Sequence, residues 1–223
     1  MWSMRVNATE EEYLQTFLEL QEDGVPPIRA RLADRLRISP AAVSEGIHRL
    51  IDRGLAIEEN RLLTLTPAGE EAGRAVVRRH RLAECFLVDI LDLPWAHAHR
   101  EASRWEHVLS QDVERRIVEL LGDPPVCPHG NPIPGSKRKR PDDPSMTLAD
   151  CGPGPVRLVR ISEQAQADEG AIDFLAEARL LPGQVVEVLA EADAADPGTA
   201  VVSAQGKDIV PAWISALVWV APA

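Results

Sequence analysis

Hydrophobic positions recur at helical spacing through the first 52 residues of the chain. After Thr9 an apolar stripe of Tyr13, Phe17 and Leu20 predicts a helix, with Thr9 as its cap and Glu12 completing a capping box. Residues 29–36 and 40–52 predict two further helices joined by a tight turn, the second opening at Pro40. Two short helices joined in this way are typical of a helix-turn-helix unit.

The pattern changes to alternation after Gly54. Residues 55–58 and 63–66 alternate between apolar and polar positions on either side of Glu59-Asn60-Arg61, which predicts a hairpin wing. Helical spacing returns over 67–91 and again over 98–121. The apolar positions of these helices exceed what one face of a small domain needs, so we expect a dimer interface there.

Proline and glycine crowd residues 122–155, which also hold the basic run from Lys137 to Arg140, and this composition indicates a linker. Alternating segments at 156–161, 185–189, 199–203 and 209–210, closed by 214–220, then predict short strands. With one helix near 171–178, they favour a small β-barrel of the SH3 type.

Composition and charge limit which functions the chain can have. The 223 residues carry a net charge of −11, which argues against coating nucleic acid by bulk attraction. The window 25–56 nevertheless holds six arginines against three acids, a local charge of +3. Three scattered cysteines and no apolar run of spanning length predict a soluble cytoplasmic protein with no membrane partner.

One stretch carries candidate metal ligands. His99, Ser103, Glu106 and His107 fall at i, i+4, i+7 and i+8, so on a helix they would share one face. His80 and Glu84 form a second helical pair upstream. Imidazoles and carboxylates that converge from two helices are what a divalent cation needs, so we expect a metal site.

Four segments together resemble the diphtheria-toxin-repressor, or iron-dependent repressor, family of metal-activated transcription regulators, including its manganese-responsive branch. They are Arg29-Ala30-Arg31-Leu32-Ala33, His80-Arg81-Leu82-Ala83-Glu84, Arg104-Trp105-Glu106-His107-Val108 and Gly130-Asn131-Pro132-Ile133-Pro134-Gly135. The resemblance implies a mainly helical fold with β-structure. Its expected domains are a winged helix-turn-helix at 1–73, a helical dimerisation and metal-binding domain at 74–135, a linker at 136–155 and an SH3-like β-barrel at 156–223.

The resemblance also implies two metal sites, and so two or more ions per subunit. Its primary site maps onto Glu12, Ser103, Glu106 and His107. Its ancillary site maps onto His80, Glu84 and His99, with further oxygen ligands from the third domain, for which Asp168 and Glu169 are favoured over Asp173.

The primary set departs from both branches of the family. Iron-type members carry Met and Cys where this chain has Glu12 and Ser103, and manganese-type members carry carboxylates at both positions. Loss of both sulfur ligands shifts the site toward hard ions, so we expect Mn²⁺ to gain on Fe²⁺ as the corepressor.

The expected partner is double-stranded operator DNA, bound by a homodimer, with manganese or iron homeostasis genes as the targets. Metal would tie the first helix to the dimerisation domain and fix the spacing of the two recognition helices. The residues expected to contact the phosphates, grooves or base edges of DNA are Arg29, Ser39, Ala41, Ser44, Glu45 and the wing residue Arg61. Glutamine is usual in the family where Glu45 stands.

Other functions stay open at this point. A metal-dependent hydrolase could use the same histidines and carboxylates, although no H-E-x-x-H motif is present and we expect no enzyme. A winged-helix regulator with a purely structural metal site, or one that answers an organic effector, is a further alternative. The same switch could also activate a promoter instead of repressing it.

Overall fold

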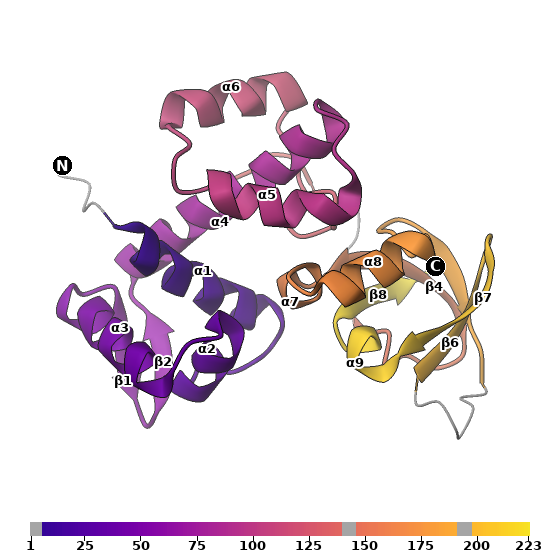
Figure 1. Ribbon diagram of the computed structural model, residues 1–223, viewed down its shortest axis with the longest axis horizontal. Helices are drawn as coiled ribbons and strands as arrows, with labels where there is room; N and C mark the ends of the chain where they lie inside the picture. Colours follow the sequence, from indigo (N-terminus) through magenta and orange to yellow (C-terminus); the bar gives the residue numbers. More distant parts are fainter. Residues whose placement is uncertain (1–5, 140–145, 191–197) are drawn as a thin grey trace. The chain divides into compact units, whose positions relative to one another are not determined.

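The computed structural model describes residues 6–139, 146–190 and 198–223 (Figure 1). The chain divides into two compact units. The first unit comprises Met1–His80 and Trp105–Leu109, and the second comprises Arg81–Arg104 and Ser110–Ala223. Part of the predicted linker, residues 140–145 with Arg140 of the basic run, lies outside the described residues. The finer boundaries expected from the sequence, 1–73, 74–135, 136–155 and 156–223, stay predictions.

The first unit is a helix-turn-helix with a two-stranded wing. Its elements are α1 (Ala8–Glu22), α2 (Arg29–Leu36), α3 (Pro40–Asp52), β1 (Ala56–Glu59), β2 (Leu62–Leu65) and the beginning of α4 (Pro67–Asp89). Ser39 caps α3 by accepting from the amide of Ala42, and Pro40 occupies the first helical position. Asn60 and Arg61 both take positive φ, which produces the tight turn between β1 and β2.

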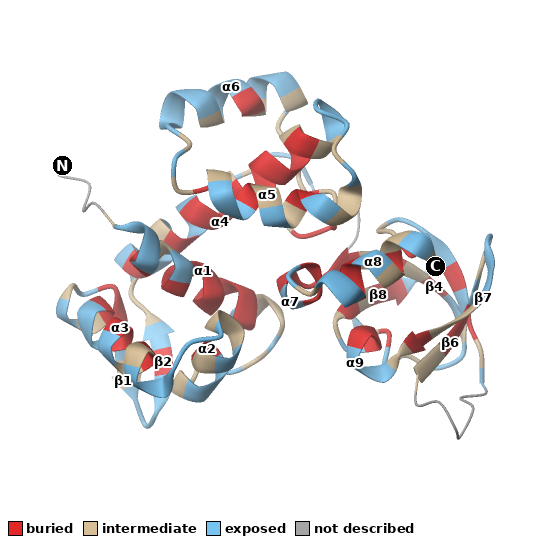
Figure 2. Ribbon diagram, viewed as in Figure 1, coloured by how far each residue is buried: buried red, intermediate tan, exposed pale blue. Residues whose placement is uncertain are grey.

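The beginning of α1 differs from the expected one. Asn7, not Thr9, is the N-cap, and the capping box joins the Asn7 side chain to Glu10 instead of joining Thr9 to Glu12. Asn7 holds extended backbone, and its side-chain oxygen accepts from the amide of Glu10 at 3.0 Å. The helix therefore begins two residues earlier than expected. Glu10 is buried and Glu12 is exposed, and most of the rest of α1 is buried (Figure 2).

In the second unit α4 continues and is followed by η1 (Trp95–His97), α5 (Ala98–Trp105) and α6 (Gln111–Leu121). The expectation that His99, Ser103, Glu106 and His107 share one helical face is wrong, because α5 ends at Trp105. Glu106 and His107 lie in the turn that follows, and this turn belongs to the first unit.

The C-terminal part of the second unit is a six-stranded antiparallel sheet with the order β3-β8-β4-β5-β6-β7. The strands are β3 (Met146–Thr147), β4 (Gly154–Ile161), β5 (Val185–Val188), β6 (Gly198–Ser203), β7 (Gly206–Pro211) and β8 (Val218–Pro222). The helices are α7 (Glu163–Gln166), α8 (Glu169–Glu177) and α9 (Ala212–Ser215). The segment 214–220, expected as one strand, is divided between α9 and β8.

A loop after α6 docks against β4 within the second unit. The amide of Ile161 donates to the carbonyl of His129 at 2.8 Å, and the side-chain amide of Asn131 donates to the carbonyl of Ile161 at the same distance. Gly130 has positive φ, and a Cβ there would lie 2.0 Å from the carbonyl oxygen of Val159. Glycine is therefore required at this close approach.

The fold class expected from the sequence is confirmed: a winged helix-turn-helix, a helical region and a six-stranded antiparallel sheet of the SH3-like kind. Among the described residues, no helix has the length and apolar character needed to cross a membrane.

Candidate metal centre

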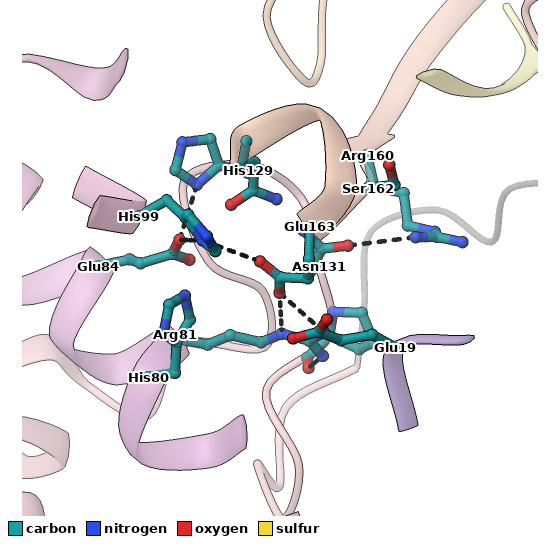
Figure 3. A network of polar contacts seen from close by, with 12 residues as sticks. Glu19, His80, Arg81, Glu84, His99, His129, Asn131, Arg160, Ser162 and Glu163 are labelled. Atoms are coloured by element: carbon teal, nitrogen blue, oxygen red, sulfur yellow. Dashed lines mark hydrogen bonds and ion pairs between the residues drawn. The ribbon is translucent and has the colours of Figure 1, made fainter. Parts of the chain in front are cut away.

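A buried cluster in the second unit joins three of its helices. Glu84 comes from α4, His99 from α5 and Glu163 from α7, and their side chains point toward one another (Figure 3). Nδ1 of His99 lies 3.6 Å from Oε1 of Glu84 and 3.2 Å from Oε2 of Glu163. The Glu84 side chain is fully buried and that of Glu163 is 5% exposed. Two buried carboxylates on either side of one imidazole need positive charge nearby.

A second group shares Glu84. Cys127 and His129 of the docking loop each offer a ligand atom within 4.8 Å of the other and of Glu84. Oε1 of Glu84 lies 3.2 Å from Nδ1 of His129, and the other ring nitrogen of His129 interacts with the carbonyl of Trp95 at 3.2 Å. Burial, and next the Glu84 charge, raise the pKa of the Cys127 thiol well above its usual range. A cation would favour the thiolate.

Arg81 provides fixed positive charge beside the cluster. Its guanidinium is fully buried, pairs with Oε1 of Glu163 at 3.0 Å and donates to the carbonyl of Pro132 at 2.6 Å. His80 stands one turn before Glu84 on α4, so the two side chains leave the same face of that helix.

The donor set fits a divalent cation. Imidazole nitrogens, carboxylate oxygens and one thiol are the ligands that transition-metal ions take in proteins. Oε1 of Gln166, one turn beyond Glu163 on α7, is buried and lacks a hydrogen-bond partner among the described residues. A buried acceptor in this condition is costly unless something outside the described protein atoms satisfies it.

A separate set of ligand-type residues lies in the first unit. Nδ1 of His107 is 2.7 Å from Oε2 of Glu11, and Nε2 of His107 is 3.3 Å from Oε1 of Glu106. Nδ1 of His80 is 2.5 Å from Oε2 of Glu106. Arg79 pairs with Oε1 of Glu11 at 2.6 Å and donates to the carbonyl of Glu106. Helix α1 is thus tied to the 105–109 turn through a carboxylate and an imidazole.

The structure does not bring all the expected ligands into these clusters. Glu12 is exposed on α1, and Ser103 is exposed on α5, where its hydroxyl donates to the carbonyl of His99. Asp168 caps α8 by accepting from the amide of Ala171, and Glu169 is exposed and pairs with Arg100. Their roles as ligands stay predictions.

The sequence did not lead us to Glu163, Cys127 or His129. His129 was expected to be structural, and Cys127 was expected to have no histidine partner at a useful spacing, whereas the structure groups the two with Glu84. The Cys-Pro-His-Gly order before Asn131 was a usable signal, because a thiol and an imidazole two residues apart can both turn toward one ion. Glu163 offered no local signal, since only the packing of α7 places it beside His99.

The expected DNA-contacting residues lie in the first unit. Ser39, Ala41, Glu45 and Arg61 are exposed, and Ser44 is half-buried. Glu45 pairs with Arg49 at 2.5 Å, one turn later on the exposed face of α3. Arg29 is held by Glu58 of the wing through two hydrogen bonds of 3.0 and 2.6 Å, and it donates to the carbonyl of Ser44.

Comparison with known proteins agrees with this arrangement. Residues 6–62 match the family described as "Iron dependent repressor, N-terminal DNA binding domain", and residues 66–135 match "Iron dependent repressor, metal binding and dimerisation domain". The iron-dependent repressor IdeR of Mycobacterium bovis is 42% identical over 191 residues, which are 81% of this chain and 83% of that protein. The diphtheria toxin repressor of Corynebacterium diphtheriae is 40% identical over 210 residues, 90% of this chain and 91% of the relative.

Among solved structures, a manganese-dependent transcriptional repressor in complex with manganese superposes with a TM-score of 0.82 at 32% identity. That match covers 96% of this chain and all of the other. The manganese regulator SloR superposes with a TM-score of 0.77 at 25% identity, over 99% of this chain and 100% of that structure.

A winged helix joined to buried histidine and carboxylate clusters defines the class: metal-dependent, DNA-binding transcription regulators. The chain belongs to the iron-dependent repressor family. Its named relatives are transcriptional repressors, so the expectation of a regulator instead of an enzyme is confirmed.

Proposed function

We propose that this protein represses manganese and iron homeostasis genes by binding operator DNA when Mn²⁺ or Fe²⁺ is bound. The observation that carries the proposal is the 2.7 Å contact between Glu11 of α1 and His107 of the 105–109 turn. It joins α1, which lies in the part of the chain that matches the DNA-binding family domain, to a segment that matches the metal-binding and dimerisation domain.

The charges at this contact support control by a cation. The carboxylates of Glu11 and Glu106 both contact His107, and Glu106 is buried. Like charges gathered in this way repel one another. A bound divalent cation supplies the positive charge that draws such donors together.

We assign the primary site to Glu106 and His107, with a carboxylate from α1. The family resemblance points to Glu12 and to Ser103 as further ligands, whereas the geometry points to Glu11. The second site is proposed at Glu84, His99 and Glu163, with His80 from the same face of α4. Cys127 and His129 are the alternative partners of Glu84.

The donor chemistry supports different ions at the two sites. The primary set consists of nitrogen and oxygen donors, which suit Mn²⁺ and leave Fe²⁺ as the second candidate. Where Cys127 and His129 are the partners of Glu84, the thiolate is a soft ligand that favours Zn²⁺ or Fe²⁺ over Mn²⁺.

Operator DNA is proposed to lie along α3 and the wing. Ser39 and Ser44 suit phosphate oxygens, Ala41 suits a thymine methyl group, and Glu45 accepts from a cytosine amine. Arg61 at the exposed hairpin tip contacts the backbone or the minor groove. Arg29 supports the wing through Glu58 and reaches phosphate only by leaving that pair.

We propose a homodimer that uses α6 and the end of α4. Val113 and Leu120 on α6 and Leu91 after α4 are large apolar side chains that remain exposed. Apolar surface of this kind marks an interaction site, and a two-fold partner would present two recognition helices to half-sites about one DNA turn apart. A cytoplasmic location follows from an operator as the target.

The test is fluorescence anisotropy of the protein on DNA from its own upstream region, titrated with Mn²⁺, anaerobic Fe²⁺ or chelator at fixed salt. Tight binding only with metal supports the proposal, and the order of the two ions tests the loss of sulfur ligands. Binding that is equal in chelator would overturn the corepressor role and favour an organic effector or a structural metal site.

A further inference from the structure

Helix α1 turns two different faces toward functional parts of the first unit. Glu11 faces His107 and Arg79, as described above. Glu10 and Tyr13, its neighbours on the same helix, contact the recognition helix α3 instead. One turn of helix therefore touches both the proposed primary metal site and the element that reads DNA.

The contact through Tyr13 is specific. Its side chain is 3% exposed, and its hydroxyl donates to the carbonyl of Ala42, in the first turn of α3, at 3.0 Å. The ring occupies the space left by Gly46, where a Cβ would lie 2.3 Å from Cζ of Tyr13.

The contact through Glu10 reaches the other end of α3. The Glu10 carboxylate accepts from the amide of Asn7 at 3.0 Å and forms an ion pair with Arg53, the C-cap residue of α3. Glu10 is buried, so this pair is screened by solvent less than a surface pair. Helix α3 is thus held to the beginning of α1 at both of its ends.

These contacts suit residues that position the recognition helix α3. We propose that Tyr13 and the Glu10–Arg53 pair transmit the position of the first turn of α1 to α3, so that a cation at Glu11 and His107 sets the orientation of the recognition helix. The inference rests on the proposed function. Metal and DNA binding are linked, so each raises the affinity for the other by the same factor. A variant that loses this transmission should reduce both effects equally.

The main variant is Tyr13→Phe, which keeps the ring against Gly46 and removes only the hydrogen bond to Ala42. The matched control is Thr16→Val, which removes another buried hydroxyl of α1, one that donates to the carbonyl of Glu12 within the same helix at 2.8 Å. Arg53→Met is the second variant and removes the charge at the far end of α3.

The quantity measured is the ratio of operator affinity with Mn²⁺ to that in chelator. In Tyr13→Phe this ratio is expected to fall about three- to tenfold, the range that one buried hydrogen bond is worth. Mn²⁺ affinity without DNA should stay within about twofold of wild type, and Thr16→Val should keep the wild-type ratio. Arg53→Met should lower the same ratio. A lost phosphate contact of Arg53 would weaken operator binding equally with Mn²⁺ and in chelator, so it would leave the ratio unchanged.

Amide hydrogen exchange gives a readout that needs no DNA. In the wild type Mn²⁺ should slow exchange in both α1 and α3, and in Tyr13→Phe it should slow exchange in α1 only. Equal protection of α3 in the variant, or a lowered melting temperature with an unchanged affinity ratio, would overturn the proposal and leave Tyr13 a packing residue. Wild-type protein that binds DNA equally well with and without Mn²⁺ would instead contradict the proposed function, and the inference with it.

Discussion

Nδ1 of His107 lies 2.7 Å from Oε2 of Glu11, although 96 positions of sequence separate the two residues. Glu11 belongs to a helix of the DNA-binding unit, and His107 follows the end of α5. Arg79 binds the other oxygen of the same carboxylate, at 2.6 Å. Both carboxylate oxygens of Glu11 are therefore in contact with a partner, while the neighbouring Glu12 is exposed.

This geometry predicts that Glu11→Gln weakens the metal response. The amide loses the charge that faces His107, so the Mn²⁺ concentration for half-maximal DNA binding should rise by about tenfold or more. Fluorescence anisotropy on operator DNA measures it. Glu12→Gln is the matched variant and should shift the midpoint less than about threefold. The reverse order would show that Glu12 is the ligand, as the family resemblance implies.

Glu163→Gln should weaken the second metal site. At a Mn²⁺ concentration about 100 times the wild-type Kd, binding contributes about 2.7 kcal/mol to stability, and a tenfold weaker site would contribute about 1.4 kcal/mol. Urea unfolding with and without metal measures that difference. Glu169→Gln removes an exposed carboxylate that the family resemblance names as a ligand of this site; it should leave the difference unchanged if Glu163 takes that place, and a loss there would make Glu169 the ligand. A normal metal-induced gain in Glu163→Gln would exclude Glu163 as a ligand.

Cys127→Ser should change which ion the second site prefers. Removing the soft ligand should weaken Zn²⁺ about tenfold or more and leave Mn²⁺ within about threefold, because Mn²⁺ gains little from a thiolate. Competitive titration with a chromophoric chelator provides both affinities. Equal losses for the two ions would mean that Cys127 acts by packing in the buried loop.

Glu58→Gln should destabilise the first unit in a pH-dependent way. The hydrogen bond from Arg29 lowers the pKa of Glu58, so this carboxylate contributes stability above its ordinary pKa and loses it as the pH falls through the lowered value. The pair is partly exposed, so the cost at neutral pH should be only about 0.5 kcal/mol. Unfolding curves of wild type and variant should converge in acid, and a constant difference at all pH values would contradict the assignment.

Gly46→Ala should destabilise the protein although alanine favours a helix over glycine by about 1 kcal/mol. The new Cβ would meet the Tyr13 ring, and overpacking of this kind costs about 1–3 kcal/mol. In a Tyr13→Leu background, which lacks the ring, the same substitution should become favourable. Urea unfolding of wild type, the two single variants and the double variant measures the change in unfolding free energy caused by Gly46→Ala in each background. A loss of stability of equal size in both backgrounds would show that the Tyr13 ring is not the cause.

The sequence alone determined the local elements of this protein. Helical spacing around Phe17 and Ile47, Pro40 at the beginning of α3 and the turn at Asn60-Arg61 each depend on neighbours a few residues away. Backbone preference and amphipathic burial act over that range, so the winged helix and the SH3-like strands could be predicted. The four segments that resemble the repressor family led to the functional class, because their residues can be recognised without knowledge of the fold.

Tertiary structure decided which side chains meet. The face of α1 that packs in the first unit fixes the direction of each of its side chains, since neighbouring residues of a helix point about 100° apart. This packing places Glu11 opposite His107 and Tyr13 against Gly46. The end of α5 at Trp105 separates His99 from His107, and the docking of the loop and of α7 places His129 and Glu163 beside Glu84 and His99. No spacing in the sequence records these contacts, because they depend on how distant elements pack.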